Sequence, residues 1–106
     1  MIDQWILKFK KNALPSIMKE FEPNKVIMFG SRVNGTAKRN SDLDIILVSD
    51  YFVNIPFLKR MSIALKKIAF PKHIDYLCYT PKEYKKIKNE SSIIMDALKN
   101  SMEIVI

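Results

Sequence analysis

The sequence predicts a domain of mixed helices and strands, of the α/β or α+β class. Three short apolar runs, at 26–29, 45–48 and 74–79, have the composition of buried strands. Segments with apolar residues every three or four positions lie before the first run, between the second and third, and after the third, as in amphipathic helices. The chain has 106 residues, and we expect 1–106 to form a single domain.

The N-terminal segment is expected to be helical from Asp3 to about Phe21. Pro15 falls inside it and cannot donate a backbone hydrogen bond, so a break or kink is expected near Ala13 and Leu14. Residues 22–24 are turn formers and lead into the first strand.

A second helix is expected from Phe57 to Phe70, ended by Pro71. Its predicted core stripe consists of Phe57, Leu58, Met61, Ala64, Leu65 and Ile68. The basic residues outside this stripe are Lys59, Arg60, Lys66 and Lys67.

A third helix is expected to begin at Thr80, because Thr80 can act as N-cap with Pro81 at the first position and Glu83 at the third. It is expected to end near Asn89. The next helix is expected to start at 91–92, with inward-facing residues Ile93, Ile94, Ala97 and Leu98. A short final strand is expected over 102–106.

Composition limits the environment of the protein. Hydrophobic residues make up 48% and charged residues 27%, as in soluble globular domains. No apolar run approaches the roughly 20 residues that span a bilayer, so no membrane association is expected. Cys78 is the one cysteine, which excludes an intramolecular disulfide and favours a reducing, cytoplasmic setting.

The net charge of +7 is compatible with a nucleic-acid partner, an acidic protein partner or an anionic substrate. The lysines are spread along the chain, and only Lys82, Lys85, Lys86 and Lys88 form a local run. Such a run is typical of a solvated helix face. We therefore expect no direct nucleic-acid binding.

The chemistry is concentrated between the first two strands. Gly30 and Ser31 end the first strand sharply, and Asp42 and Asp44 stand at the head of the second. Side chains alternate along a strand, so the two carboxylates are expected to point the same way. Two such charges about 5 Å apart repel by roughly 3 kcal/mol, which a divalent cation would convert into coordination. The alternative is an ordinary loop with Ser41 and Asp42 as turn residues.

A third carboxylate, Asp75, lies inside the third strand between Ile74 and Tyr76. If this strand lies beside that of Asp42 and Asp44, Asp75 completes a three-carboxylate site for a pair of metal ions. Alternatively, Asp75 faces solvent on an edge strand or pairs with His73 or Lys72. His73 is expected to stand at the start of the strand without a catalytic role.

Together these residues resemble the signature of the polymerase β-type nucleotidyltransferase superfamily. The matching positions are Phe29-Gly30-Ser31-Arg32, Gly35, Ser41-Asp42-Leu43-Asp44-Ile45 and Asp75. The string is similar to that of the minimal nucleotidyltransferases, small proteins usually paired with HEPN-domain proteins as antitoxin and toxin. The resemblance implies a small mixed sheet of three to four strands flanked by helices.

The resemblance also implies roles for these residues. Asp42, Asp44 and Asp75 would be catalytic and would bind two Mg²⁺ ions. Asp75 would also help to orient or deprotonate the acceptor hydroxyl. Gly30 and Ser31 would hold the β- and γ-phosphates of ATP.

Two further residues complete the implied nucleotide-binding set. Arg32 would contact a phosphate or the acceptor, or else pack its stem on the domain surface. Ser41 would orient the following carboxylate or cap the turn. No segment is identified as the reader of the nucleotide base.

The function implied is a protein adenylyltransferase of antitoxin type. It would move AMP from ATP to a hydroxyl, expected to be a tyrosine, of a HEPN-family ribonuclease toxin, releasing pyrophosphate. The chain is too short to hold a further acceptor-binding domain, so a partner protein is expected to complete the acceptor side. Both a homo-oligomer and a hetero-oligomer are compatible with this expectation. The alternatives are an antitoxin that neutralises its partner by binding alone, and an RNA or small-molecule nucleotidyltransferase.

Overall fold

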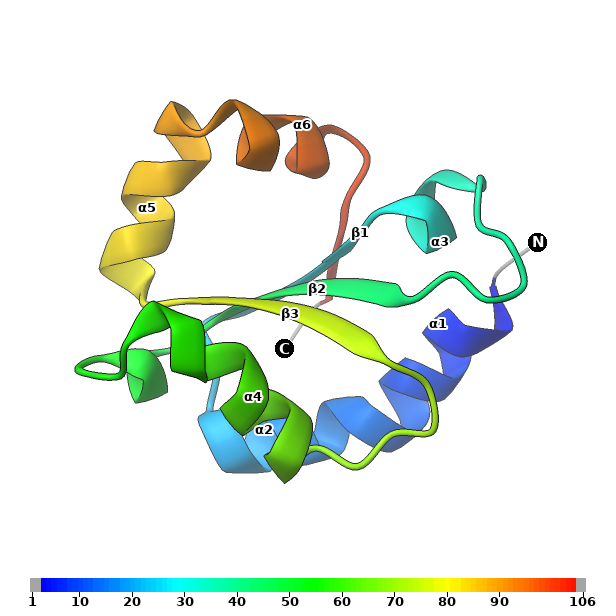
Figure 1. The fold of residues 1–106 in the computed structure, drawn as a ribbon, viewed down its shortest axis with the longest axis horizontal. Helices are drawn as coiled ribbons and strands as arrows, with labels where there is room; N and C mark the ends of the chain where they lie inside the picture. Colours follow the sequence, from blue (N-terminus) through cyan, green and yellow to red (C-terminus); the bar gives the residue numbers. More distant parts are fainter. Residues whose placement is uncertain (1–2, 105–106) are drawn as a thin grey trace.

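A computed structural model of the chain describes residues 3–104. Four strands form one sheet in the order β3-β2-β1-β4 (Figure 1). The strands are β1 (Lys25–Phe29), β2 (Leu43–Val48), β3 (Ile74–Tyr79) and β4 (Met102–Ile104). The β2–β3 pair is parallel and the other two pairs are antiparallel. This mixed sheet flanked by helices confirms the predicted fold class.

The N-terminal helical segment changes geometry where Pro15 predicted an interruption. It consists of α1 (Gln4–Lys8), a π-helical segment (Phe9–Ala13) and α2 (Leu14–Phe21). The backbone N–H of Leu14 donates to the carbonyl oxygen of Phe9, so the wider π-helical turn carries the chain into the proline without loss of helical path. Pro15 then lies in the first turn of α2, where its missing N–H is tolerated.

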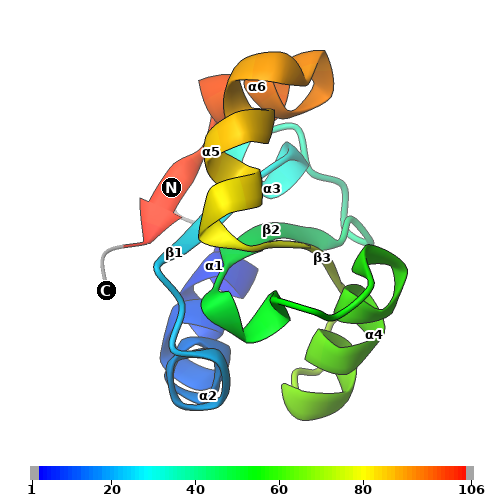
Figure 2. The ribbon, with the colours of Figure 1, turned by 90° about the vertical axis from the view of Figure 1, so that its left-hand side faces the viewer.

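The two faces of the sheet pack against different helices (Figure 2). One face packs on α1, α2 and α4 (Phe57–Lys67), through alternate residues such as Val26, Ile45 and Tyr76. The opposite face packs on α5 (Pro81–Glu90) and α6 (Ser92–Lys99), through Ile27, Ile46 and Tyr79. Side chains alternate along strands, so Asp44 and Asp75 share the second face with Ile46 and Tyr79.

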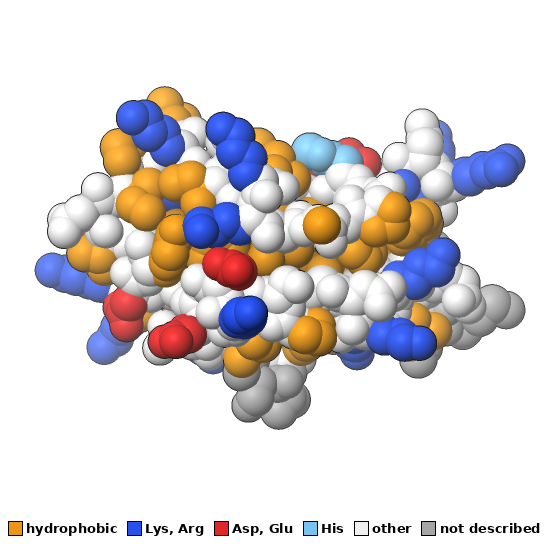
Figure 3. Space-filling model, turned by 90° about the horizontal axis from the view of Figure 1, so that it is seen from below, with side chains coloured by type: hydrophobic (Ala, Val, Ile, Leu, Met, Phe, Trp, Pro, Cys, Tyr) orange, Lys and Arg blue, Asp and Glu red, His pale blue; other side chains and the backbone are white. Residues whose placement is uncertain are grey.

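The stripe predicted for α4 is wrong in part. Ala64 and Ile68 are buried as predicted, but Leu58 is 92% exposed, and Phe57, Met61 and Leu65 are also exposed. Figure 3 shows this side of the molecule, with hydrophobic side chains at the surface among lysines and arginines. The helix also ends at Lys67, three residues before the expected end at Phe70.

Arg60, which the sequence placed outside the core stripe, is buried. Its guanidinium donates to both carboxylate oxygens of Glu83, at 2.6 and 3.2 Å, and to the carbonyl oxygens of Ile55 and Cys78. Burial of the charge is tolerated because it is paired and hydrogen-bonded. These partners turn α4 so that Arg60 faces the end of β3.

The C-terminal part follows the prediction closely. Thr80 and Glu83 form the expected capping box at the start of α5, and Ser91 caps α6. Ile94 is buried, but Ile93, expected to face inward, is 78% exposed. The final strand β4 pairs with β1 over 102–104, and the remaining residues of that prediction, 105–106, lie outside the described range.

The two remaining short elements are the single turn α3 (Ser31–Asn34) and a 3₁₀-helical turn at Asp50–Phe52. The thiol of Cys78 is buried, as expected for a structural cysteine. Among residues 3–104, no helix combines the length and the apolar character needed to cross a membrane.

Candidate active site

The turn at Gly30 connects β1 to α3 in a conformation that only glycine adopts readily. Its φ is +83° and its ψ is −165°. A Cβ atom at this position would also overlap the carboxylate of Asp44 on the neighbouring strand. Glycine is therefore required twice, once by the backbone and once by the close approach of Asp44. The expected interruption after the first strand is confirmed, and the turn is packed directly on a carboxylate.

The parallel pairing of β2 and β3 places Asp44 directly opposite Asp75. The condition set by the sequence, that the third strand lies beside the second, is thus met. Asp42 precedes β2 by one residue, and its charge also acts on Asp44. Partial burial, and then the charges of Asp75 and Asp42, raise the pKa of Asp44 above its usual value. Among residues 3–104, no cationic side chain pairs with Asp44 to offset this negative charge.

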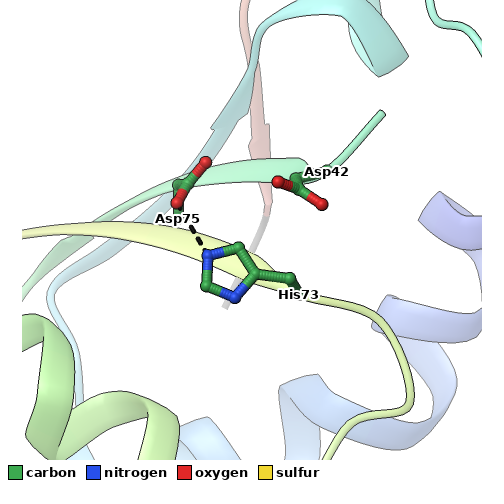
Figure 4. A group of neighbouring side chains, drawn as sticks. All are labelled: Asp42, His73 and Asp75. Atoms are coloured by element: carbon green, nitrogen blue, oxygen red, sulfur yellow. Dashed lines mark hydrogen bonds and ion pairs between the residues drawn. The ribbon is translucent and has the colours of Figure 1, made fainter. Parts of the chain in front are cut away.

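Three side chains converge at the open end of this sheet face (Figure 4). One oxygen each of Asp42 and Asp75 and one ring nitrogen of His73 lie within 4.8 Å of one another, an arrangement that could hold a metal ion. His73 Nε2 is 2.9 Å from Asp75 Oδ1, and both side chains are about half exposed. Asp44 is not in this group of ligand atoms.

The pairing of Asp75 with His73 was one of the two alternatives to a metal site in the sequence. The structure shows that the pair and the candidate metal group coexist, because the same Asp75 carboxylate also faces Asp42. Carboxylate oxygens suit Mg²⁺ and Mn²⁺, and imidazole nitrogen suits transition metals. The donor set therefore fits a divalent cation. The metal-binding and catalytic roles of Asp42, Asp44 and Asp75 stay predictions.

Arg32 lies on α3, and its side chain is only 9% exposed. Its guanidinium pairs with Asp3 at 3.0 Å and donates to the carbonyl oxygens of Lys38, Arg39 and Ser41. Burial raises the pKa of Asp3, but the hydrogen bonds from Arg32 and from backbone N–H groups outweigh it and hold that pKa below its usual value. Arg32 thus ties the start of α1 to the loop that leads into Asp42.

Ser41 stabilises the same loop. Its hydroxyl oxygen accepts a hydrogen bond from the backbone N–H of Lys38 at 2.8 Å, which is the turn-capping role that the sequence offered as one possibility. Direct contact of Arg32 or Ser41 with a nucleotide stays a prediction. Their observed contacts are with Asp3 and within the loop that leads into Asp42.

The sequence profile of the nucleotidyltransferase domain family matches residues 11–102, which include the glycine turn and all three aspartates. The chain belongs to this family. A crystal structure of a protein from Sulfolobus solfataricus described as a nucleotidyltransferase has the same fold, with a TM-score of 0.63 and 23% sequence identity. The similarity covers 93% of the chain described here and 78% of the Sulfolobus chain. No protein with a curated description matches in sequence.

Proposed function

We propose that this nucleotidyltransferase moves AMP from ATP to a hydroxyl group of a partner protein, with release of pyrophosphate. The observation that carries the proposal is the register of β2 and β3, which sets Asp44 opposite Asp75 beside the glycine turn. Membership of the nucleotidyltransferase domain family supports nucleotidyl transfer in general. The resemblance to minimal nucleotidyltransferases supports a tyrosine of a HEPN-family ribonuclease toxin as the acceptor.

Divalent cations, two Mg²⁺ ions in our proposal, would be held by Asp42, Asp44 and Asp75 and would neutralise the charge of the triphosphate and of the acceptor oxygen. The N–H groups at Gly30 and Ser31 and the Ser31 hydroxyl bind the β- and γ-phosphates. Asp75 orients the acceptor hydroxyl and takes its proton. The acceptor oxygen then forms a bond to the α-phosphorus as the bond to the pyrophosphate oxygen breaks.

The open geometry of the site supports a large acceptor. The side chains of His73 and Asp75 are 47% and 49% exposed, so solvent reaches this end of the sheet face. A hydroxyl carried on the surface of another protein can reach such a site, whereas a deep pocket would select small acceptors. The ribonuclease would then be inactivated by a covalent modification, the AMP group attached to its hydroxyl.

The test is the intact mass of the candidate toxin after co-expression with the wild-type chain and with Asp44→Asn. We expect increments of one AMP residue with the wild type and none with the variant. The control is Asp50→Asn, an exposed carboxylate at the opposite end of β2, which should leave the increments unchanged. A tight complex without any increment would contradict the proposal and would indicate an antitoxin that acts by binding.

A further inference from the structure

A cavity of about 320 Å³ lies beside the glycine turn, between the end of β1, the turn α3 and the helix α6. Its lining includes Phe29, Gly30, Ile93, Asp96, Ala97 and Asn100. Its volume falls at the lower end of the range typical of small-molecule sites. The residues come from two parts of the chain, 29–34 and 93–100, so only the folded structure brings them together.

The cavity adjoins the candidate active site at Gly30. One side of this residue faces the Asp44 carboxylate, and the same residue lines the cavity. Asp44 and Asp75 lie on the sheet face that α5 and α6 cover, and residues of α6 line the cavity beside the end of β1. A ligand whose phosphates rest on the turn at Gly30 therefore has space for its remaining part between β1 and α6.

The lining has the two kinds of surface that a nucleoside needs. Phe29 offers a half-buried aromatic ring, and Ile93 is an apolar side chain that is 78% exposed and has no place in the core. Asp96 lies on α6 and Asn100 is the C-cap of that helix, and both line the cavity. Neither makes a side-chain hydrogen bond with other residues of 3–104, which leaves a carboxylate and an amide available beside the apolar surfaces.

We propose that this cavity binds the nucleoside part of the triphosphate. The base packs between Phe29 and Ile93, and Asp96 and Asn100 hydrogen-bond to the polar edge of the base and to the ribose hydroxyls. This inference rests on the proposed function, because it requires that a nucleoside triphosphate is the substrate. It adds the residues that distinguish a nucleotide from a bare polyphosphate.

Titration calorimetry with ATP and with tripolyphosphate distinguishes binding of the nucleoside part from binding of the phosphates. ATP and inorganic tripolyphosphate are each titrated, in Mg²⁺, into the wild-type chain and into the double variant Asp96→Ala, Asn100→Ala. We expect the double variant to bind ATP about tenfold or more weakly, the effect of losing one or two hydrogen bonds. Its affinity for tripolyphosphate should equal that of the wild type. The variant Ala97→Leu, which places a larger side chain in the cavity, should act in the same way.

The matched control is Met95→Gln, at an exposed position of α6 that does not line the cavity. It should bind both ligands like the wild type. Unchanged ATP affinity in the double variant would overturn the inference and leave the proposed function intact. Equal loss of ATP and tripolyphosphate affinity would also overturn it, because the variants would then act on the phosphate turn. Failure of the wild type to bind either ligand in Mg²⁺ would instead refute the proposed function.

Discussion

Replacing Gly30 with alanine tests how the turn and the carboxylate depend on each other. At φ +83° and ψ −165°, Gly30 occupies a backbone region that is essentially closed to other residues. An alanine Cβ would also overlap the Asp44 carboxylate. The carboxylate is the end of a side chain and can rotate away, so we expect Gly30→Ala to fold with Asp44 displaced from its present position.

The size of the effect follows from the backbone. A residue forced into this region loses about 1–3 kcal/mol of stability. Each kcal/mol lowers the Tm of a domain of about this size by roughly 4–8 °C. Gly35 provides a matched comparison, because its φ is also +83° but its ψ is 10°, and a Cβ there meets nothing within 4 Å. Gly35→Ala should cost only about 1 kcal/mol, the usual cost of a left-handed residue.

The assay has two readouts, urea unfolding for stability and calorimetric titration with ATP and Mg²⁺ for the site. Gly30→Ala should unfold at lower urea than Gly35→Ala and should lose most of its affinity for the nucleotide, whereas Gly35→Ala should keep it. Normal nucleotide affinity in Gly30→Ala would refute the reasoning, since a displaced Asp44 would then not matter. Equal destabilisation by both substitutions would refute the argument from backbone conformation.

Three other substitutions test the electrostatics and the loop. Because the pKa of Asp44 is raised in the folded state, the charged carboxylate opposes folding above that pKa. Asp44→Asn should therefore raise the free energy of unfolding by about 0.5 kcal/mol, after allowance for solvent screening. The measurement is urea unfolding at pH 7 with a chelator present. Arg32→Lys should lower the free energy of unfolding by about 1–3 kcal/mol and weaken ATP binding, since lysine cannot span Asp3 and three carbonyls; exposed Arg39→Lys is the control. The Arg60 hydrogen bond holds the pKa of Glu83 below its ordinary value of 4.5, so this pair stabilises the fold above pH 4.5 and ceases to do so as the pH falls through the lowered pKa. Glu83→Gln should therefore lower the Tm at pH 7 and flatten its decline in acid, as measured by circular dichroism.

The structural features that depend on neighbouring residues in the sequence could be predicted from the sequence. The glycine turn and the capping box at Thr80 each depend on a few neighbouring residues. The placement of Asp75 required one further step, the adjacency of β2 and β3. The structure shows that β2 and β3 are adjacent and parallel, with Asp44 opposite Asp75. No local sequence pattern predicts which residues of two strands pair.

The errors concern helix faces. Spacing shows that α4 and α6 are amphipathic, but not how each helix is rotated against the sheet. In α4 the rotation follows the contacts of Arg60 with Glu83 and with a carbonyl at the end of β3, partners far away in sequence. In α6, Ile94 is buried and Leu98 packs against the core, while Ile93 lines the cavity beside Gly30. Both departures come from tertiary contacts, and the second coincides with a candidate binding surface.

Asp44 shows how function opposes stability at this site. On the same face of β2, two positions further on, Ile46 is fully buried against Tyr84 and Ile94 of α5 and α6. A fold selected for stability alone would place a similar apolar residue at 44. The charge instead faces Asp75, which contributes to the rise in its pKa. A bound divalent cation would reverse the sign of this interaction, so Mg²⁺ should stabilise the wild type more than Asp44→Asn.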